Sequence, residues 1–295
     1  MNAFELNNLT KVFPDFTLGP LNLNLEPGIV LGYIGPNGAG KSTTMHCMMG
    51  LLRSDSGSVT IFGKPNDLNK PEWKHDVGYV GDENPFYENW SCAKNLTFLR
   101  HFYPAWSDDL VANLARRFDL KLDQKVKTLS TGNRIKLACI CALAHQPKLL
   151  LLDEPTSGLD PVVRTELLDV LFEVLESGER AILYSTHILS DISRLADDLV
   201  FLNEGHIHLR TPKEDLIENW RKITFRLSNP DLTVDATVSH RHDGDEHHII
   251  SSNAQTSLRH LSELGAQNIA ETRMGIDEIA VEIIRGNKHV AHHQS

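Results

Sequence analysis

The segment GPNGAGKST, Gly35 to Thr43, has the residue types and spacing of a phosphate-binding loop, GxxxxGK[ST]. It follows a predicted strand that ends at Ile34 and it opens a predicted helix, which is the context such a loop requires. Gly35, Gly38 and Gly40 allow backbone conformations that are closed to residues with a Cβ, so consecutive N–H groups can point at phosphate oxygens. The helix N-terminus adds its positive dipole end.

The residues of this phosphate loop also supply charge and a metal ligand. The Lys41 ammonium can reach the β- and γ-phosphates of a nucleotide, and the Ser42 hydroxyl can coordinate Mg²⁺. The predicted nucleotide-binding set is Gly35, Pro36, Asn37, Gly38, Ala39, Gly40, Lys41, Ser42 and Thr43. A glycine-rich turn that matches by chance is the alternative, and the strand–loop–helix context argues against it.

The phosphate loop alone does not distinguish a GTPase, a kinase and an ATPase. A GTPase usually carries a guanine-reading NKxD segment after a later strand. The segment here that looks similar, Asn69 to Glu72, lies early in the chain and ends in glutamate. We therefore interpret it as a coincidence.

Two acids and a histidine follow apolar segments further along the chain. LLLLDEP, Leu149 to Pro155, places Asp153 at the C-terminal end of a predicted buried strand, where open parallel sheets collect their ligands. Asp153 can hold Mg²⁺ through its water shell, and Glu154 can orient and polarise an attacking water. His187 follows the apolar strand RAILYST and could contact a γ-phosphate or hold the water and Glu154. The alternatives are strand-end solubility for the acids and a structural role for the histidine.

The chain that positions these residues has the composition of an ordinary globular protein. Its 295 residues, 41% apolar and 23% charged, are enough for a core domain and a small appendage. The formal net charge of −10 argues against nucleic acid or an anionic lipid surface as the main partner. No apolar run approaches a membrane span, and the N-terminus has no secretory-signal pattern. We expect a cytosolic chain whose cysteines, Cys47, Cys92, Cys139 and Cys141, are reduced and mostly buried.

Apolar patterning predicts an α/β protein. Short strands lead into the phosphate loop, and a mostly helical stretch follows from about Pro85 to Pro147, with Ser107 as the expected N-cap of one helix. Strand–helix alternation resumes at KLLLLDEP, so the helical stretch is an insert in a mostly parallel sheet. We expect a core domain over 1–219, a small α+β appendage over 220–285 and a frayed tail over 286–295.

A hairpin in the predicted appendage is rich in histidines and acids. The residues concerned are His240, His242, Asp243, Asp245, Glu246, His247 and His248. They could bind a transition metal if the hairpin gathers them. Because their spacing matches no standard metal site, a solvated turn is the preferred interpretation.

The segment LSTGN, Leu129 to Asn133, completes a set of ordered motifs. Together with the phosphate loop, LLLLDEP and His187, it makes the chain similar to the nucleotide-binding subunits of ATP-binding cassette (ABC) transporters over about 4–216. In that family the corresponding signature turn is usually LSGGQ, belongs to the helical subdomain and binds the γ-phosphate of ATP held by the opposite subunit. Ser130, the backbone at Gly132 and the N-terminus of the next predicted helix would form this second anion site.

The resemblance implies a P-loop NTPase core of the ABC type. Its sheet would be mostly parallel with flanking helices, preceded by an antiparallel N-terminal portion and interrupted by the helical subdomain at about 85–147. The implied assembly is a head-to-tail dimer, with an identical or a different second ABC subunit, around two ATP molecules and Mg²⁺. The signature turn residues implied to contact the partner's ATP are Ser130, Thr131, Gly132 and Asn133.

Two further residues resemble functional positions of the family. Asp160, in TSGLDP, resembles the D-loop aspartate that lies across the dimer interface and helps to position Glu154. Phe13, in KVF, lies where the family places an aromatic side chain on adenine. Phe16 is a nearby alternative for the same role.

The sequence departs from the family pattern in two places. Thr131 stands where the signature turn usually has glycine, which adds a Cβ near the phosphate, and Asn133 stands where glutamine is usual. Asp82, beside Glu83, stands where the family usually has a glutamine that binds Mg²⁺ and relays the nucleotide state to the membrane partner. An aspartate can still coordinate Mg²⁺ but is shorter and has no amide donor.

The resemblance implies an ATPase that drives a separate integral membrane permease from the cytoplasmic face. In this hypothesis Lys41, Glu154 and His187 are catalytic. Ser42, Asp82 and Asp153 hold the metal. The acids after VGYV, the following FYENW and the short helical insert are most similar to exporter-type subunits. The transported substrate is not encoded in a domain that contacts ATP and a permease.

Two other functions fit the same ATP-binding motifs. A soluble ABC protein could act as an ATP-dependent clamp on a ribosome or on DNA. One cassette, no heptad run and an acidic chain argue against that alternative. A purely regulatory ATP sensor would bind without turnover, and the presence of Glu154 and His187 argues against it.

Overall fold

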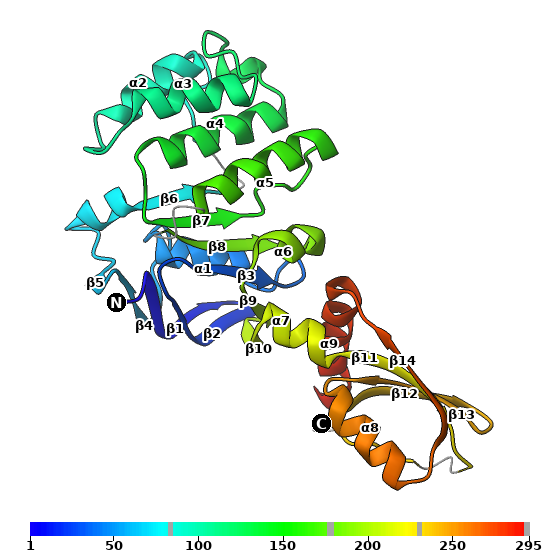
Figure 1. Ribbon diagram of the computed structural model, residues 1–295. Coiled ribbons are helices and arrows are strands. Elements are labelled where there is room, and N and C mark those ends of the chain that lie inside the picture. Colours follow the sequence, from blue (N-terminus) through cyan, green and yellow to red (C-terminus); the bar gives the residue numbers. More distant parts are fainter. Residues whose placement is uncertain (82–84, 176–179, 229–231, 292–295) are drawn as a thin grey trace. The chain divides into compact units, whose positions relative to one another are not determined.

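The structure is a computed structural model that describes residues 1–81, 85–175, 180–228 and 232–291. The chain forms two compact units, Met1–Leu209 and Arg210–Ser295. Figure 1 labels their elements. Within the described ranges, no helix combines the length and the apolar character needed to cross a bilayer.

An antiparallel sheet forms the N-terminal part of the first unit. Its strand order is β2-β1-β4-β5. The strands are β1 (Phe4–Phe13), β2 (Phe16–Leu25), β4 (Ser56–Ile61) and β5 (Lys64–Pro65). Alternating apolar residues such as Phe4, Leu6 and Leu23 are buried on one face of this sheet, where they join the main core of the unit.

The second sheet of this unit carries the site and has the order β10-β9-β3-β8-β7-β6. Its strands are β3 (Val30–Ile34), β6 (Val77–Val80), β7 (Leu149–Asp153), β8 (Ala181–Thr186), β9 (Asp198–Asn203) and β10 (His206–Pro212). From β9 to β6 all neighbours pair in parallel. Strands β3, β7 and β8 are buried at every residue because both faces of the sheet are covered.

Strand β3 occupies the topological switch point of this sheet. Its neighbours β8 and β9 both follow it in sequence, so the chain leaves β3 to build strands on either side. In open α/β sheets, ligands bind at the carboxyl ends of the strands beside such a point. The phosphate loop begins there, directly after Ile34.

Helices connect the parallel strands. They are α1 (Lys41–Met48), α5 (Pro161–Leu175) and α6 (Leu189–Leu195), with a short 3-10 helix at Pro71–Asp76. Helix α1 buries Met45 and Met48 in the main core and ends before Gly50, whose φ of 66° is left-handed. The predicted α/β class and mostly parallel sheet are confirmed.

The segment between β6 and β7 is helical, as predicted. It contains α2 (Cys92–Arg100), α3 (Asp108–Arg117), a 3-10 turn at Val126–Thr128 and α4 (Thr131–Ala144). The side chains of Ser91, Ser107 and Ser130 cap α2, α3 and α4 by accepting hydrogen bonds from backbone N–H groups. Figure 1 shows α2, α3 and α4 packed together beyond β6 and β7.

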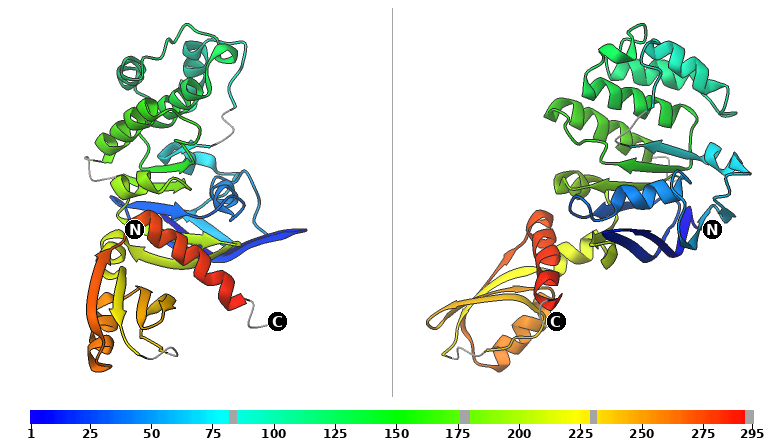
Figure 2. Two further views of the ribbon diagram at one scale, coloured as in Figure 1. Left: turned by 90° about the vertical axis from the view of Figure 1, so that its right-hand side faces the viewer. Right: turned by 180° about the vertical axis from the view of Figure 1, so that it is seen from behind.

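The second unit is a small α+β fold. It contains α7 (Lys213–Asn219), β11 (Arg221–Arg226), β12 (Thr237–Asp243), β13 (Glu246–Ser251), α8 (Ala254–Glu263), β14 (Gln267–Arg273) and α9 (Ile276–Ala291). The strands pair antiparallel in the order β12-β13-β11-β14. Figure 2 shows the elements of this unit in two further views, with α9 in red. Ile223 and Phe225 pack with Leu261 of α8, whereas Lys222 pairs with Glu278 of α9, so the two helices lie on opposite faces. Helix α9 continues to Ala291, into the segment expected to fray from residue 286.

Candidate functional site

The phosphate loop shapes a cavity of about 600 Å³ at the N-terminus of α1. Its lining residues are Phe16, Asn37, Gly38, Gly40, Lys41, Ser42, Thr43, Glu154, Ser157 and His187. Gly40 is the N-cap of α1 with φ 108°, and no side chain caps this helix. The first N–H groups of α1 are therefore not used by a capping side chain, and they can serve an anion. The volume is within the range of small-molecule sites.

Lys41 is fixed at the base of this cavity. Its side chain is only 5% exposed, and its Nζ donates to the carbonyl oxygens of Gly35 at 2.8 Å and Pro36 at 3.1 Å. The same Nζ lies 3.1 Å from Oε1 of Glu154. The loop thus holds its own lysine with two carbonyl groups, and Gly35 and Pro36 contribute in this way rather than by lining the cavity.

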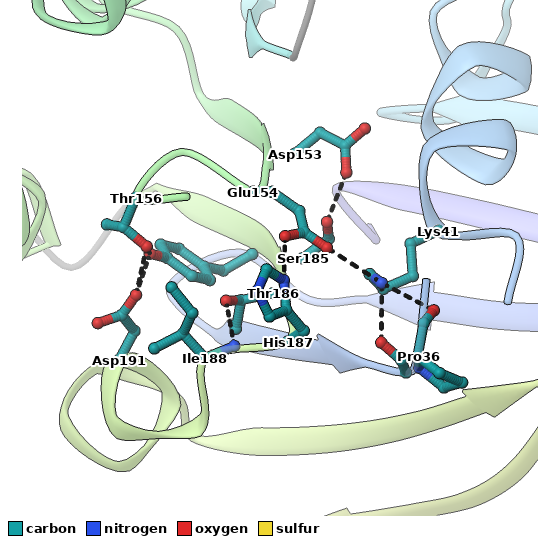
Figure 3. Close-up of polar contacts among 12 residues, drawn as sticks. Pro36, Lys41, Asp153, Glu154, Thr156, Ser185, Thr186, His187, Ile188 and Asp191 are labelled. Carbon is teal, nitrogen blue, oxygen red and sulfur yellow. Dashed lines mark hydrogen bonds and ion pairs between the residues drawn. The ribbon is translucent and has the colours of Figure 1, made fainter. Parts of the chain in front are cut away.

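Glu154 joins the phosphate loop to His187. One carboxylate oxygen pairs with Lys41 and the other contacts Nδ1 of His187 (Figure 3). The Glu154 backbone has a φ of 49°, a left-handed conformation that costs a non-glycine residue roughly 1–3 kcal/mol. Its N–H donates to the carbonyl of Ser185 at 3.1 Å, which ties the end of β7 to the end of β8. The structure therefore brings together the side chains of Lys41, Glu154 and His187, each more than 30 positions from the next in the sequence.

Asp153, at the end of β7, does not line the phosphate-loop cavity. It is 2% exposed, and its Oδ1 accepts a hydrogen bond from the Ser185 hydroxyl at 2.5 Å. It lines a second cavity of about 430 Å³. The lining residues of this cavity are Val80, Gly81, Pro85, Thr131, Arg134, Ile135, Asp153, Glu154, Pro155 and Ser157. The two cavities share Glu154 and Ser157.

The predicted magnesium ligands are divided between these cavities. Ser42 lines the first and Asp153 the second. A hydroxyl and a carboxylate are oxygen donors of the kind that Mg²⁺ prefers, so the two residues fit the metal by their chemistry. Asp82, the third predicted ligand, lies outside the described residues.

The signature turn begins α4 and does not line the phosphate-loop cavity. Ser130 is exposed, and its Oγ accepts from the N–H of Asn133 at 3.2 Å. Thr131 lines the second cavity. Gly132 and Asn133 are half-buried. Within one chain, the turn and the phosphate loop therefore contribute to separate cavities.

Two predicted residues, Asp160 and Phe13, do not line the phosphate-loop cavity. Asp160 is exposed, and its Oδ1 accepts from the backbone N–H groups of Val162 and Val163 at 3.0 and 3.1 Å, which caps α5. Phe13 is absent from the cavity lining, whereas Phe16 is present in it. Phe13 ends β1 and Phe16 begins β2, the two residues are opposite each other in this hairpin, and their ring centroids are 6.2 Å apart.

Sequence reasoning missed the polar side chains that support this site. Ser185 bonds Asp153, and the buried Asp191 accepts from the hydroxyls of Thr156 and Tyr184. Polar residues at the end of an otherwise apolar strand, as in AILYST, were the available signal for Ser185. No motif indicated Asp191.

The histidine-rich hairpin gathers only part of its residues. The rings of His240, His242 and His247 lie within about 6 Å of one another, and Nε2 of His240 is 2.9 Å from Nδ1 of His247. Among the described residues, no set of three histidine, cysteine or acidic side chains has the geometry to hold a metal. The expectation of a solvated turn is wrong for His247, which is fully buried and stacks on Phe225.

A larger cavity, of about 710 Å³, lies on the face of the second unit's sheet toward α9. It is lined among others by Lys222, Arg241, His248, Ile250 and Glu282. None of the residues predicted to carry chemistry with phosphate lines this cavity. The phosphate-loop cavity is smaller, but a phosphate loop, an acid and a histidine converge there.

The cysteines carry no chemistry of this site. Cys47, Cys92, Cys139 and Cys141 are all free thiols. Burial raises the pKa of Cys139 to about 12 and that of Cys47 to about 11. These thiols therefore stay protonated near neutral pH and are poor nucleophiles.

Comparisons with known proteins agree on one family. A family model described as ABC transporter matches residues 18–157. The chain is 30% identical over 281 residues to a bacitracin transport ATP-binding protein of Bacillus licheniformis, with 94% of this chain and 92% of the relative covered. It is 36% identical over 211 residues to a lantibiotic transport ATP-binding protein of Streptococcus pyogenes, with 70% and 89% covered. A solved structure of the ATP binding subunit of an ABC transporter shares 28% identity and a TM-score of 0.66, covering 73% of this chain and 92% of that one.

Proposed function

The chain belongs to the ABC transporter family as an ATP-binding, ATP-hydrolysing subunit, and from this premise we propose how its residues act. The triphosphate binds along the phosphate loop with its charge on Lys41, and Glu154 activates the attacking water. The observation that carries this proposal is the placement of Glu154, 3.1 Å from Lys41 and in contact with His187, at the wall of the phosphate-loop cavity.

In the proposed reaction, water attacks the γ-phosphorus and the bond to the β-phosphate oxygen breaks, which gives ADP and phosphate. Glu154 orients the water and accepts its proton, and His187 holds the Glu154 carboxylate and contacts the γ-phosphate. Lys41 neutralises charge on the phosphates. Because the Glu154 carboxylate now pairs with Lys41, the nucleotide competes with it for the same ammonium group.

The remaining ligands of the nucleotide follow from the same placement. Ser42 and Asp153 would hold Mg²⁺, which supplies charge neutralisation for the phosphates. Asp82 is retained as a candidate third ligand on sequence grounds. The Phe16 ring lines the cavity and is the better candidate than Phe13 for stacking on adenine.

We propose a dimer as the hydrolytically active form. Each signature turn, through Ser130 and the first N–H groups of α4, would bind the γ-phosphate of ATP on the second subunit. The separation of this turn from the phosphate-loop cavity of its own chain supports that arrangement. Asp160, at the exposed start of α5, would lie at the same interface.

The partner that the dimer drives is proposed to be an integral membrane permease. Relatives are named as transport ATP-binding proteins for bacitracin and for a lantibiotic, and another as a Nod factor export ATP-binding protein. We infer an exporter on that basis, with the chain peripheral on the cytoplasmic face of the membrane. The division into an ATPase domain over 1–219, with its helical subdomain at about 85–147, and an appendage over 220–285 is part of the same proposal.

The variant Glu154→Gln tests this function. The amide keeps the size of the side chain but cannot accept a proton, so ATP hydrolysis is expected to fall by about 10²–10⁴-fold. ATP binding should persist or tighten, because the competing negative charge beside Lys41 is gone. In size-exclusion chromatography with Mg-ATP, the variant should elute at twice the mass of the 33.1 kDa chain.

A matched control keeps this test specific. Glu173 is a carboxylate of the same unit that pairs with Arg117 at the surface. Glu173→Gln should hydrolyse ATP at the wild-type rate and dimerise only transiently. Wild-type turnover in Glu154→Gln would contradict the catalytic assignment, and a variant that binds ATP as a monomer would contradict self-pairing.

A further inference from the structure

Asp191, on α6, is a buried carboxylate that joins separate parts of the first unit. Its side chain is 0% exposed. Oδ2 accepts hydrogen bonds from the Thr156 hydroxyl at 2.5 Å and the Tyr184 hydroxyl at 3.0 Å. Oδ1 accepts from the Arg164 guanidinium, with Nε at 2.6 Å and Nη2 at 2.5 Å. Figure 3 shows Asp191 facing Thr156 beside the Glu154 and His187 pair.

The partners of Asp191 belong to the segments that hold the proposed catalytic residues. Thr156 lies two positions after Glu154, in the turn that follows β7. Arg164 is in the first turns of α5, where its backbone N–H donates to the carbonyl of Asp160 at 3.0 Å. Asp191 itself follows His187 by four positions. One carboxylate therefore fixes the turn after Glu154 against the segment that carries His187.

The charge of Asp191 is compensated well enough to remain buried. An isolated carboxylate in the interior is unstable unless it is paired and hydrogen-bonded, and here a guanidinium and two hydroxyls satisfy it. Burial, and next the negative charge of Asp191, raise the pKa of Tyr184 far above its ordinary value, so Tyr184 stays a hydroxyl donor. Asp191 therefore has a defined set of hydrogen-bond donors, which are Thr156, Tyr184 and Arg164.

The turn that Asp191 fixes includes a strained residue. Glu154 has a left-handed backbone, which persists only where surrounding contacts impose it. On the β8 side, the Glu154 N–H bonds the carbonyl of Ser185. After Glu154, the Thr156 hydroxyl donates to Oδ2 of Asp191 at 2.5 Å and also lies 3.2 Å from the Tyr184 hydroxyl, and the shorter bond, to Asp191, holds the turn. Loss of this bond would let the Glu154 side chain shift relative to His187.

We propose that Asp191 is a positioning residue for ATP hydrolysis, acting through Thr156 to hold the turn that carries Glu154 in its strained conformation. This proposal rests on the hydrolytic role given to Glu154 above. Asp191 lines neither cavity of the site. Its loss should therefore lower kcat and leave nucleotide affinity unchanged.

Thr156→Val is the first test because it removes the hydroxyl and keeps the shape of the side chain. We expect kcat for ATP to fall about tenfold, since small displacements of a catalytic group are costly, with KM and the Kd for ATP within twofold of wild type. Thr156→Ser, which restores the hydroxyl, should recover wild-type kcat. Ser257→Ala is the control: it removes a buried hydroxyl of the second unit, which bonds Ser251 and the carbonyl of Asp235, and should lower the melting temperature without changing kcat.

The decisive measurement combines Thr156→Val with Glu154→Gln. If Thr156 acts by placing Glu154, the valine causes no further loss of residual turnover once the carboxylate is gone. A second tenfold loss in the double variant, or wild-type kcat in Thr156→Val alone, would overturn the proposal. Should Thr156→Val fail to fold, Asp191→Asn, of the same shape, carries the same comparison, and wild-type kcat there would equally overturn it. Retained turnover in Glu154→Gln alone would instead indicate failure of the hydrolytic role itself.

Discussion

The phosphate loop and the signature turn both place a glycine before or within the first turn of a helix, but for different reasons. A Cβ built on Gly35 would lie 2.3 Å from the carbonyl oxygen of Leu202, and Gly40 has a φ of 108°. The fold of the chain itself requires glycine at these positions. A Cβ on Gly132 would meet only Leu159 and Val163, at 3.6 and 3.8 Å, which are ordinary contacts.

The packing within one chain thus leaves room for a side chain at Gly132. Glycine in a helix is less stable than alanine by roughly 0.5–1 kcal/mol, so at this position it weakens α4 without any gain inside the chain. A close approach by something outside the chain supplies a reason. This difference between the glycines of the two turns supports the proposed dimer, in which the signature turn completes the site of the second subunit.

Of the two turns compared, the phosphate loop should show the larger effect. In Lys41→Ala, the ammonium that pairs with Glu154 and is held by two loop carbonyls is removed, and ATP hydrolysis should fall by about 10²–10³-fold. ATP binding, followed with a fluorescent nucleotide, should weaken with it. Lys148→Ala removes a lysine that pairs with Asp76 at the surface and should leave both quantities unchanged. Undiminished binding in Lys41→Ala would show that the loop does not bind through this charge.

An alanine substitution in the signature turn should lower ATP hydrolysis less than Lys41→Ala does. Ser130→Ala removes a hydroxyl that caps α4 and, in the proposed dimer, contacts the partner's phosphate, so turnover should fall about tenfold. Ser91→Ala and Ser107→Ala remove the same kind of cap from neighbouring helices and lose about 1 kcal/mol of stability each. Their turnover should stay within about twofold of wild type. Equal turnover in all three variants would show that Ser130 acts only as the N-cap of α4.

Gly132→Ala sharpens the comparison because stability and activity should move in opposite directions. The added methyl fits within the chain and should raise the free energy of unfolding by about 0.5 kcal/mol. It should also lower ATP-dependent dimerisation several-fold, by obstructing the approach of the partner's phosphate. Thermal unfolding and size-exclusion chromatography measure the two effects on one sample. A variant that is more stable and dimerises fully would show that nothing approaches this glycine.

The motif residues could be predicted because local spacing determines them. The strand–loop–helix context fixes Lys41 and Ser42, and an apolar run ending in two acids fixes the end of β7. Parallel strand ends converge at one edge of a sheet, so the proximity of Glu154 and His187 was also predictable.

Other features depend on tertiary packing that no spacing encodes. Phe13 and Phe16 are opposite each other in the first hairpin, and of the two only Phe16 lines the cavity. Asp191 is buried and hydrogen-bonded to Thr156 because α6 packs beside the turn after β7. His247, predicted to be solvated, is buried because its side chain faces the α8 side of the sheet, beside Phe225.

The smallest expected effect is the pH dependence of stability caused by His145. This residue lies at the C-terminal end of α4, the helix that begins with the signature turn. His145 follows α4, and its ring nitrogens lie 3.1 Å from the carbonyl of Val77 and 3.2 Å from that of Cys141. Burial lowers the pKa of His145, outweighing these carbonyl groups. The folded state therefore takes up this proton less readily than the unfolded chain, whose histidine pKa is about 6.5.

The contribution of His145 to the free energy of unfolding should be fully present above about pH 6.5. It should be lost as the pH falls through the lowered pKa of the folded state. The contribution is bounded by about 1.4 kcal/mol per pH unit, so the melting temperature should drop by a few degrees between pH 7.5 and 5.5. His145→Gln cannot be protonated and should show a smaller drop. The signature turn begins α4, whereas the phosphate loop leads into α1. Acidification should therefore weaken ATP-dependent dimerisation before it weakens nucleotide binding. If dimerisation and nucleotide binding are lost at the same pH in wild type and in His145→Gln, protonation of His145 does not act selectively on the signature turn.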